Sequence, residues 1–121
     1  MKLKAFIPTE DIDRAVAFYR DVVGLELEGQ DTYGAHLRSG DTLVRVTTAK
    51  PFQPQPFTVL GWQVSDITEA VGRLTAAGAE FERYEGMEQD ELGIWTAPSG
   101  DRIAWFADPD GNLLSIDQPR G

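Results

Sequence analysis

Two stretches of the chain carry the same pattern of apolar and polar positions. One begins at Asp11 and the other at Asp66, an offset of 55 residues. In both, apolar residues recur at i, i+3 and i+4, which predicts an amphipathic helix that an Asp N-cap begins and a glycine, Gly24 or Gly78, ends. The repetition indicates two similar half-domains, and a duplicated module can build a cleft that neither half has alone.

Extended segments flank both predicted helices. Apolar alternation and turn residues place strands at 2–7 and 25–28 and a hairpin at 33–38 and 42–48 in the first half. In the second half, strands are predicted at 57–64, 80–84, 93–97, 102–107 and 113–117, one segment more than in the first half. We interpret the order as β-α-β-β-β in each half, which predicts an α+β fold.

A proline-rich segment at 50–56 lies between the two halves. Proline fixes φ and removes a backbone donor, so this composition is typical of a semi-extended linker. We expect a single domain over 1–121, with module one at about 1–49 and module two at about 57–121.

The composition argues against several classes of function. A formal net charge of −9 repels phosphate backbones, so we expect no nucleic-acid partner; the charge serves solubility or attracts a cationic ligand. The absence of cysteine excludes disulfides and thiolate chemistry. We see no apolar run of membrane-spanning length and no signal peptide, so we expect no membrane partner and a cytoplasmic location.

Two motifs resemble a known family. They are the helix opening at 11–19 with its continuation into Val23-Gly24-Leu25, and the late turn Asp108-Pro109-Asp110-Gly111-Asn112. Together with the paired modules they resemble the vicinal oxygen chelate superfamily, which includes glyoxalase I, extradiol dioxygenases, fosfomycin-resistance enzymes and bleomycin-resistance proteins. The resemblance implies two tandem βαβββ modules that form a concave, partly closed mixed sheet with helices on its outer face.

The resemblance also implies where metal ligands would lie. In metal-dependent members, four His, Glu or Gln side chains on the concave face bind a divalent cation. The matching positions here are Lys4, Val59, about Arg45 and about Ser115. Lys and Arg have no lone pair to give and Val has no donor atom, so we predict that the usual metal site is missing and assign no metal ligand, cofactor or catalytic residue.

Other residues offer weaker candidates for metal or ligand binding. His36, the only histidine, is interpreted either as a structural or surface residue or as a ligand. The acidic stretch 85–91, which includes Glu88, is either a solvated loop or a lid over the cleft. Arg45 requires a partner if it is buried, either an acid such as Asp117 or an anionic ligand.

Strand alternation assigns side chains to the face opposite the helices. We predict an apolar cavity with a few polar groups there, and Trp95 as a residue that stacks on a flat, cationic or aromatic ligand. The predicted ligand-binding residues are Lys4, Phe6, His36, Arg45, Gln63, Tyr84, Glu88, Trp95, Ser115 and Asp117.

Four functional interpretations remain. The first is a metal-free protein of the bleomycin-resistance type that sequesters a small molecule as a homodimer. The second is a lyase or dioxygenase of the same superfamily with a displaced metal site that uses His36 and the loop acids. The third is a metal-free lyase or isomerase that uses Lys4, Arg45 or Glu88, and the fourth is a pure interaction module.

Overall fold

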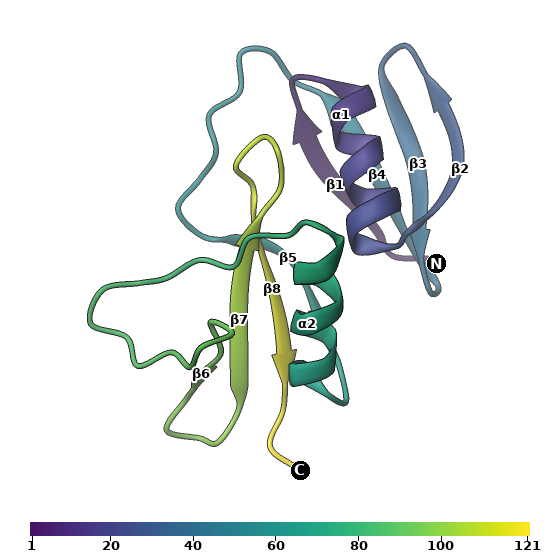
Figure 1. Ribbon diagram of the computed structural model, residues 1–121. Helices are drawn as coiled ribbons and strands as arrows, with labels where there is room; N and C mark the ends of the chain where they lie inside the picture. The colour runs from purple at the N-terminus through teal and green to yellow at the C-terminus, as the bar shows by residue number, and fades with distance from the viewer. The chain divides into compact units, whose positions relative to one another are not determined.

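The computed structural model describes all 121 residues and divides into two compact units. Unit 1 comprises Met1–Gln55 and Asp108–Asn112, and unit 2 comprises Pro56–Ala107 and Leu113–Gly121. Each unit contains one four-stranded sheet with a helix against one face (Figure 1). No helix in the chain has both the length and the apolar character needed to cross a membrane.

The sheet of unit 1 is mixed. Its strand order is β1-β4-β3-β2, with β1 parallel to β4 and the other neighbours antiparallel. The elements are β1 (Lys4–Thr9), α1 (Ile12–Ala17), the π-helix η1 (Phe18–Val23), β2 (Glu26–Asp31), β3 (Gly34–Ser39) and β4 (Thr42–Thr48).

Unit 2 repeats this topology. Its order is β5-β8-β7-β6, again with the first and last strands of the module parallel. The elements are β5 (Thr58–Gln63), α2 (Ile67–Ala77), β6 (Trp95–Thr96), β7 (Arg102–Ala107) and β8 (Leu113–Gln118). The predicted α+β fold of two tandem βαβββ modules is confirmed; both sheets are open, with two edge strands each.

Both helices begin and end as predicted. The carboxylates of Asp11 and Asp66 accept the backbone N–H three residues on, at 3.1 Å in each case. Gly24 and Gly78 end the helical segments at φ 93° and 117°, a region that only glycine adopts at no cost. The first segment holds one more residue between cap and glycine, and its second half widens into η1 to accommodate it.

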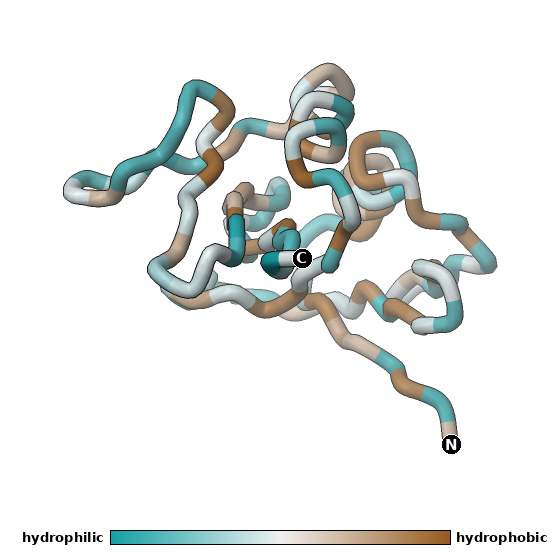
Figure 2. The backbone as a smooth tube through the Cα atoms, turned by 90° about the horizontal axis from the view of Figure 1, so that it is seen from below, coloured by the Kyte–Doolittle hydropathy of each residue, from teal (hydrophilic) through white to brown (hydrophobic).

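Alternation along the strands separates a buried face from an open one. In β4, Val44 and Val46 are buried beneath α1, whereas Arg45 between them lies on the other face. Leu114 and Ile116 of β8 are buried in the same way. Figure 2 shows hydrophilic and hydrophobic residues following one another in the N-terminal segment, where residues of both kinds are exposed. The predicted assignment of faces is confirmed.

The predicted strand at 80–84 is wrong. Phe81 forms only an isolated bridge to Phe106, and the chain then continues as a loop until Trp95. Gln89 holds this loop by donating to the carbonyls of Glu82 and Gly93, both at 2.9 Å, and by accepting from the backbone N–H of Tyr84. These side-chain bonds take the place of a sheet ladder.

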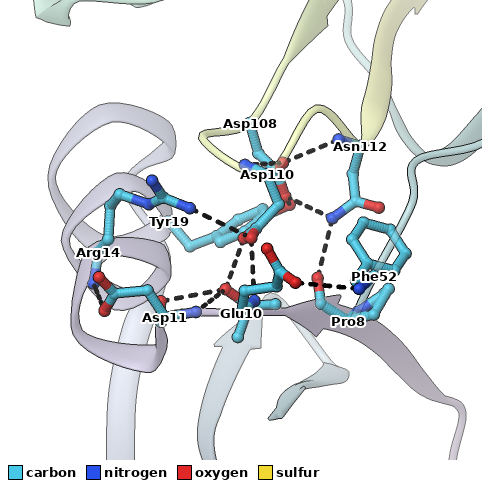
Figure 3. Close-up of polar contacts among 10 residues, drawn as sticks. Pro8, Glu10, Asp11, Arg14, Tyr19, Phe52, Asp108, Asp110 and Asn112 are labelled. Atoms are coloured by element: carbon cyan, nitrogen blue, oxygen red, sulfur yellow. Dashed lines mark hydrogen bonds and ion pairs between the residues drawn. The ribbon is translucent and has the colours of Figure 1, made fainter. Parts of the chain in front are cut away.

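The turn between β7 and β8 is part of unit 1, where its first carboxylate is buried. Asp108 is 5% exposed and accepts the Tyr19 hydroxyl at 2.7 Å (Figure 3). It also accepts the side-chain amide of Asn112 and the backbone N–H groups of Asp110 and Asn112, each at 2.9 Å. Four donors therefore satisfy a charge that would otherwise be costly to bury.

The same turn is bonded to the connection between β1 and α1. Asp110 accepts the hydroxyl of Thr9 and, at 2.9 Å, the backbone N–H of Glu10. Asn112 donates to the carbonyl of Pro8 at 3.0 Å. Gly111 has φ 88° and lies against Pro54, where a Cβ atom would come within 3.0 Å of the proline ring. The turn thus fixes the place where the first strand ends and the first helix begins.

Replacing Tyr19 with phenylalanine should destabilise the protein. The change removes one donor from the buried Asp108 carboxylate, which we expect to lower the free energy of unfolding by about 1–3 kcal/mol. Urea denaturation measures the difference. The matched control is Tyr33→Phe, because Tyr33 is 73% exposed, and it should stay within about 0.5 kcal/mol of the parent. Equal losses in the two variants would contradict this role for Tyr19.

Alkaline pH should destabilise the parent more than the Tyr19→Phe variant. Burial, and then the neighbouring Asp108 charge, raise the pKa of Tyr19 far above that of a free phenol. In the unfolded chain the phenol loses its proton near pH 10, so the stability that Tyr19 contributes is complete below about pH 10 and is lost above it. The free energy of unfolding, measured at pH 8 and pH 11 for both proteins, tests this. An equal decrease in the parent and in Tyr19→Phe would contradict the expectation.

Candidate functional site

Four predicted site residues lie in unit 1, on the sheet face opposite α1. Phe6 of β1 is the register partner of Arg45 of β4, and Arg45 is the partner of His36 of β3. Lys4 lies two residues before Phe6, and its Nζ is 5.7 Å from the centre of the Phe6 ring. The side chain of Phe6 is 62% exposed. The face therefore combines two cations, one imidazole and an exposed aromatic ring.

Arg45 has contacts within its own unit, whereas Asp117, the acid proposed from the sequence, belongs to unit 2. Its Nη1 lies 2.7 Å from Nε2 of His36, and its Nη2 lies 3.9 Å from a carboxylate oxygen of Asp31. A guanidinium only donates, so Nε2 accepts and the neutral imidazole carries its proton on Nδ1. Asp31 is the last residue of β2, a position that no sequence pattern singled out.

The residues at the expected ligand positions do not fit a metal ion. Lys4 and Arg45 are donors only, Val59 has no donor atom, and Ser115 offers a single hydroxyl. The lone pair of His36 Nε2 already accepts the Arg45 guanidinium. No group of three or more His, Asp or Glu side chains is arranged so that it could hold a metal ion. A displaced site based on His36 therefore lacks both a free imidazole nitrogen and further ligands.

The other six predicted site residues lie in unit 2. Gln63 of β5 pairs in register with Asp117 of β8, Asp117 with Ile103, and Ile103 with Trp95 of β6. Directly opposed residues point to the same side of a sheet, so these side chains form one row on the face away from α2. Ser115 belongs to the neighbouring row and lies between Gly61 and Trp105.

An aromatic cluster lies on this face. Trp105 lies at the centre of the cluster. The centroid of the Tyr84 ring is 5.6 Å from that of Trp105 in an edge-to-face arrangement, and the centroid of the Trp95 ring is 6.2 Å away, with an angle of 34° between the ring planes. Burial, and then the charge of Glu82, raise the pKa of Tyr84, so its phenol stays neutral at physiological pH. The register partner of Trp105 is Ser115, which places Trp105 on the open face.

A cavity of about 670 Å³ adjoins Trp95. Its lining consists of Gly86, Met87, Glu88, Asp90, Ile94, Trp95, Thr96 and Pro98. Two of the ten predicted site residues, Glu88 and Trp95, are therefore brought together in one cavity. No sequence pattern pointed to Met87 or Pro98, because a loop has no periodicity from which to infer side-chain orientation.

The acidic loop at 85–91 forms one wall of this cavity, and hydrogen bonds hold it in place. Asp90 accepts the backbone N–H groups of Leu92 and Ile94, both at 2.9 Å. Arg83 donates to the backbone carbonyls of Asp90 and Glu91. Glu88 forms no ion pair or hydrogen bond, so its carboxylate remains available to a ligand.

Comparisons with known proteins agree on one superfamily. The family model described as Glyoxalase/Bleomycin resistance protein/Dioxygenase superfamily matches residues 3–116. The chain is 29% identical over 112 residues to glutathione transferase FosA of Serratia marcescens, a match that covers 91% of this chain and 74% of that protein.

Solved structures show the same fold. A bleomycin resistance determinant encoded on transposon Tn5 aligns with a TM-score of 0.77 and 20% identity, covering 100% of this chain and 99% of the other. TioX from Micromonospora sp. ML1 aligns with a TM-score of 0.74 and 25% identity, covering 99% of both chains.

Metal analysis should find less than about one equivalent of divalent metal in the purified protein. The reason is that the expected ligand positions hold two cations, one aliphatic side chain and a single hydroxyl. Elemental analysis after purification without chelator, and again after incubation with Ni, Zn or Fe, makes the measurement. Stoichiometric metal that is lost on His36→Ala would show that this imidazole is a ligand.

Proposed function

Because the chain belongs to the glyoxalase/bleomycin resistance protein/dioxygenase superfamily, we propose that it binds a small molecule and sequesters it without a metal ion. The single observation that carries the proposal is the cavity beside Trp95, which has an aromatic side chain and two carboxylates, Glu88 and Asp90, in its wall. The ligand we propose is flat and cationic.

The chemistry of the cavity supports this ligand class. Its volume of about 670 Å³ falls within the range of small-molecule sites. An indole ring attracts a cation through its π face and offers a flat surface to stack on. The carboxylates of Glu88 and Asp90 add charge attraction, and the net charge of −9 favours the approach of a cation.

A metal-dependent lyase or dioxygenase is the second candidate function. The similarity to glutathione transferase FosA favours an enzyme, since that relative is named for a transfer reaction. Two observations argue against metal dependence. Lys4 and Arg45 are cations at expected ligand positions, and Nε2 of His36 already accepts a hydrogen bond from Arg45. A metal-free lyase or isomerase that uses Lys4, Arg45 or Glu88 has no arrangement of acid and base to support it.

We also propose a homodimer that is located in the cytoplasm. Large apolar side chains remain exposed in the single chain: Leu3 is 72% and Phe57 57% exposed. Where exposed apolar side chains form a contiguous patch, a partner chain can cover them.

Titration with the planar cation ethidium, and with bleomycin, should change the intrinsic tryptophan fluorescence. Trp95→Ala should weaken ethidium binding roughly tenfold, because stacking and cation–π attraction together contribute about 1–2 kcal/mol. Glu88→Gln should weaken it by a few fold and reduce its dependence on salt.

The control for this titration is Trp62→Phe. Trp62 lies on the helix-facing side of β5, so this variant should bind ethidium like the parent. An unchanged affinity in Trp95→Ala, or no response of the parent to either compound, would rule out the Trp95 cavity as the binding site for a flat cation.

A further inference from the structure

Arg45 is largely buried without a carboxylate at hydrogen-bond distance. Its side chain is 17% exposed, and its one hydrogen bond, at 2.7 Å, goes to the neutral imidazole of His36. The nearest carboxylate, that of Asp31, is 3.9 Å away and more than half exposed. The Asp31 oxygen that faces Arg45 already accepts the backbone N–H groups of Tyr33 and Gly34. The guanidinium has five N–H donors, so most of them are unused.

Other arginines in this acidic chain are satisfied differently. Arg20 forms two hydrogen bonds to the carboxylate of Asp21, and Arg38 lies in ion pairs with Glu28 and Glu26. Both of these side chains are more exposed than Arg45, at 48% and 38%. Of these three arginines, Arg45 is the least exposed and has the weakest pairing with a carboxylate. This is unexpected, because burial makes an unpaired charge more costly.

Gly34 makes room for the guanidinium. A Cβ atom at this position would lie 2.9 Å from Arg45 Nη2 and would clash with the backbone carbonyl of Val46. The φ angle of Gly34 is not in the left-handed region, so close approach, and not backbone conformation, explains the glycine here. The guanidinium consequently lies against β3, and the adjacent imidazole holds one end of it.

A second uncompensated cation lies on the same face. Lys4 takes part in no ion pair, and its ammonium group is placed over the ring of Phe6. Phe6 is in turn the register neighbour of Arg45. Two positive charges therefore flank an exposed aromatic ring, in a protein whose total charge is −9.

We propose that Arg45, positioned by His36 and assisted by Lys4, binds an oxyanion, a carboxylate or a phosphate monoester, whose apolar part lies on Phe6. A planar guanidinium matches the two oxygens of such a group in a bidentate arrangement. The site goes beyond the proposed sequestration of a cation, because it lies in unit 1 and requires the opposite ligand charge. The side-chain cations of Lys4 and Arg45 occupy two of the four positions at which the resemblance implies metal ligands.

Benzoate and phenyl phosphate are the probes. Calorimetric titration at low salt should show binding of at least one of them, weakening at least tenfold in Arg45→Met and in high salt. The matched control is Arg20→Met, which removes the same charge from an exposed site and should bind like the parent. Absence of binding by the parent, or equal affinity in Arg45→Met, would overturn the proposal.

A second measurement uses the parent alone and does not depend on the folding of a variant. His36 is the only histidine, so its imidazole nitrogens give a single set of signals in a nitrogen-15 spectrum. Phenyl phosphate or benzoate should shift these signals, and neutral benzyl alcohol at the same concentration should not. Signals that do not move with either anion would refute the site, whatever the outcome of the ethidium titration.

Discussion

Asp108 and Asp110 accept the hydrogen bonds that hold the junction between β1 and α1 in unit 1. They belong to the turn between β7 and β8, yet their partners are Tyr19, Thr9 and Glu10 of the first module. The turn holds the end of β1 and the start of α1 in place, and the position of α1 determines which face of its sheet is buried. A hydrogen bond to a charged group contributes about 1.5–3 kcal/mol, so losing even one of them removes a sizeable part of a small domain's stability.

The open sheet faces follow from that arrangement. Once Val44 and Val46 are buried beneath α1, alternation leaves Arg45 on the opposite side, and the same rule leaves Ser115 and Trp105 open in unit 2. The scaffold of the superfamily is therefore kept while the chemistry on its open faces differs: one face carries cations beside an aromatic ring, and the other carries tryptophans beside carboxylates. Neither set of side chains resembles a group of metal ligands.

Local physics explains which features the sequence could predict. Aspartate N-caps and terminal glycines each depend on a few neighbouring residues, and both predictions are confirmed at both helices. Period-two strands are confirmed except at 80–84. There the alternation of Ala79-Glu80-Phe81-Glu82 suggested a strand, but the side chain of Gln89 takes the backbone bonds that a ladder would need. The partner of Arg45 and the lining of the Trp95 cavity depend on register and loop packing, which no short window of sequence contains.

The most direct test of the account is a crystal structure of the protein soaked with ethidium, with anomalous diffraction data recorded at the absorption edges of Zn, Ni and Fe. We expect ethidium density stacked on Trp95 between the indole ring and the carboxylates of Glu88 and Asp90, and no anomalous peak near His36 or Arg45. A metal peak coordinated by His36, with Arg45 displaced from Nε2, would contradict it.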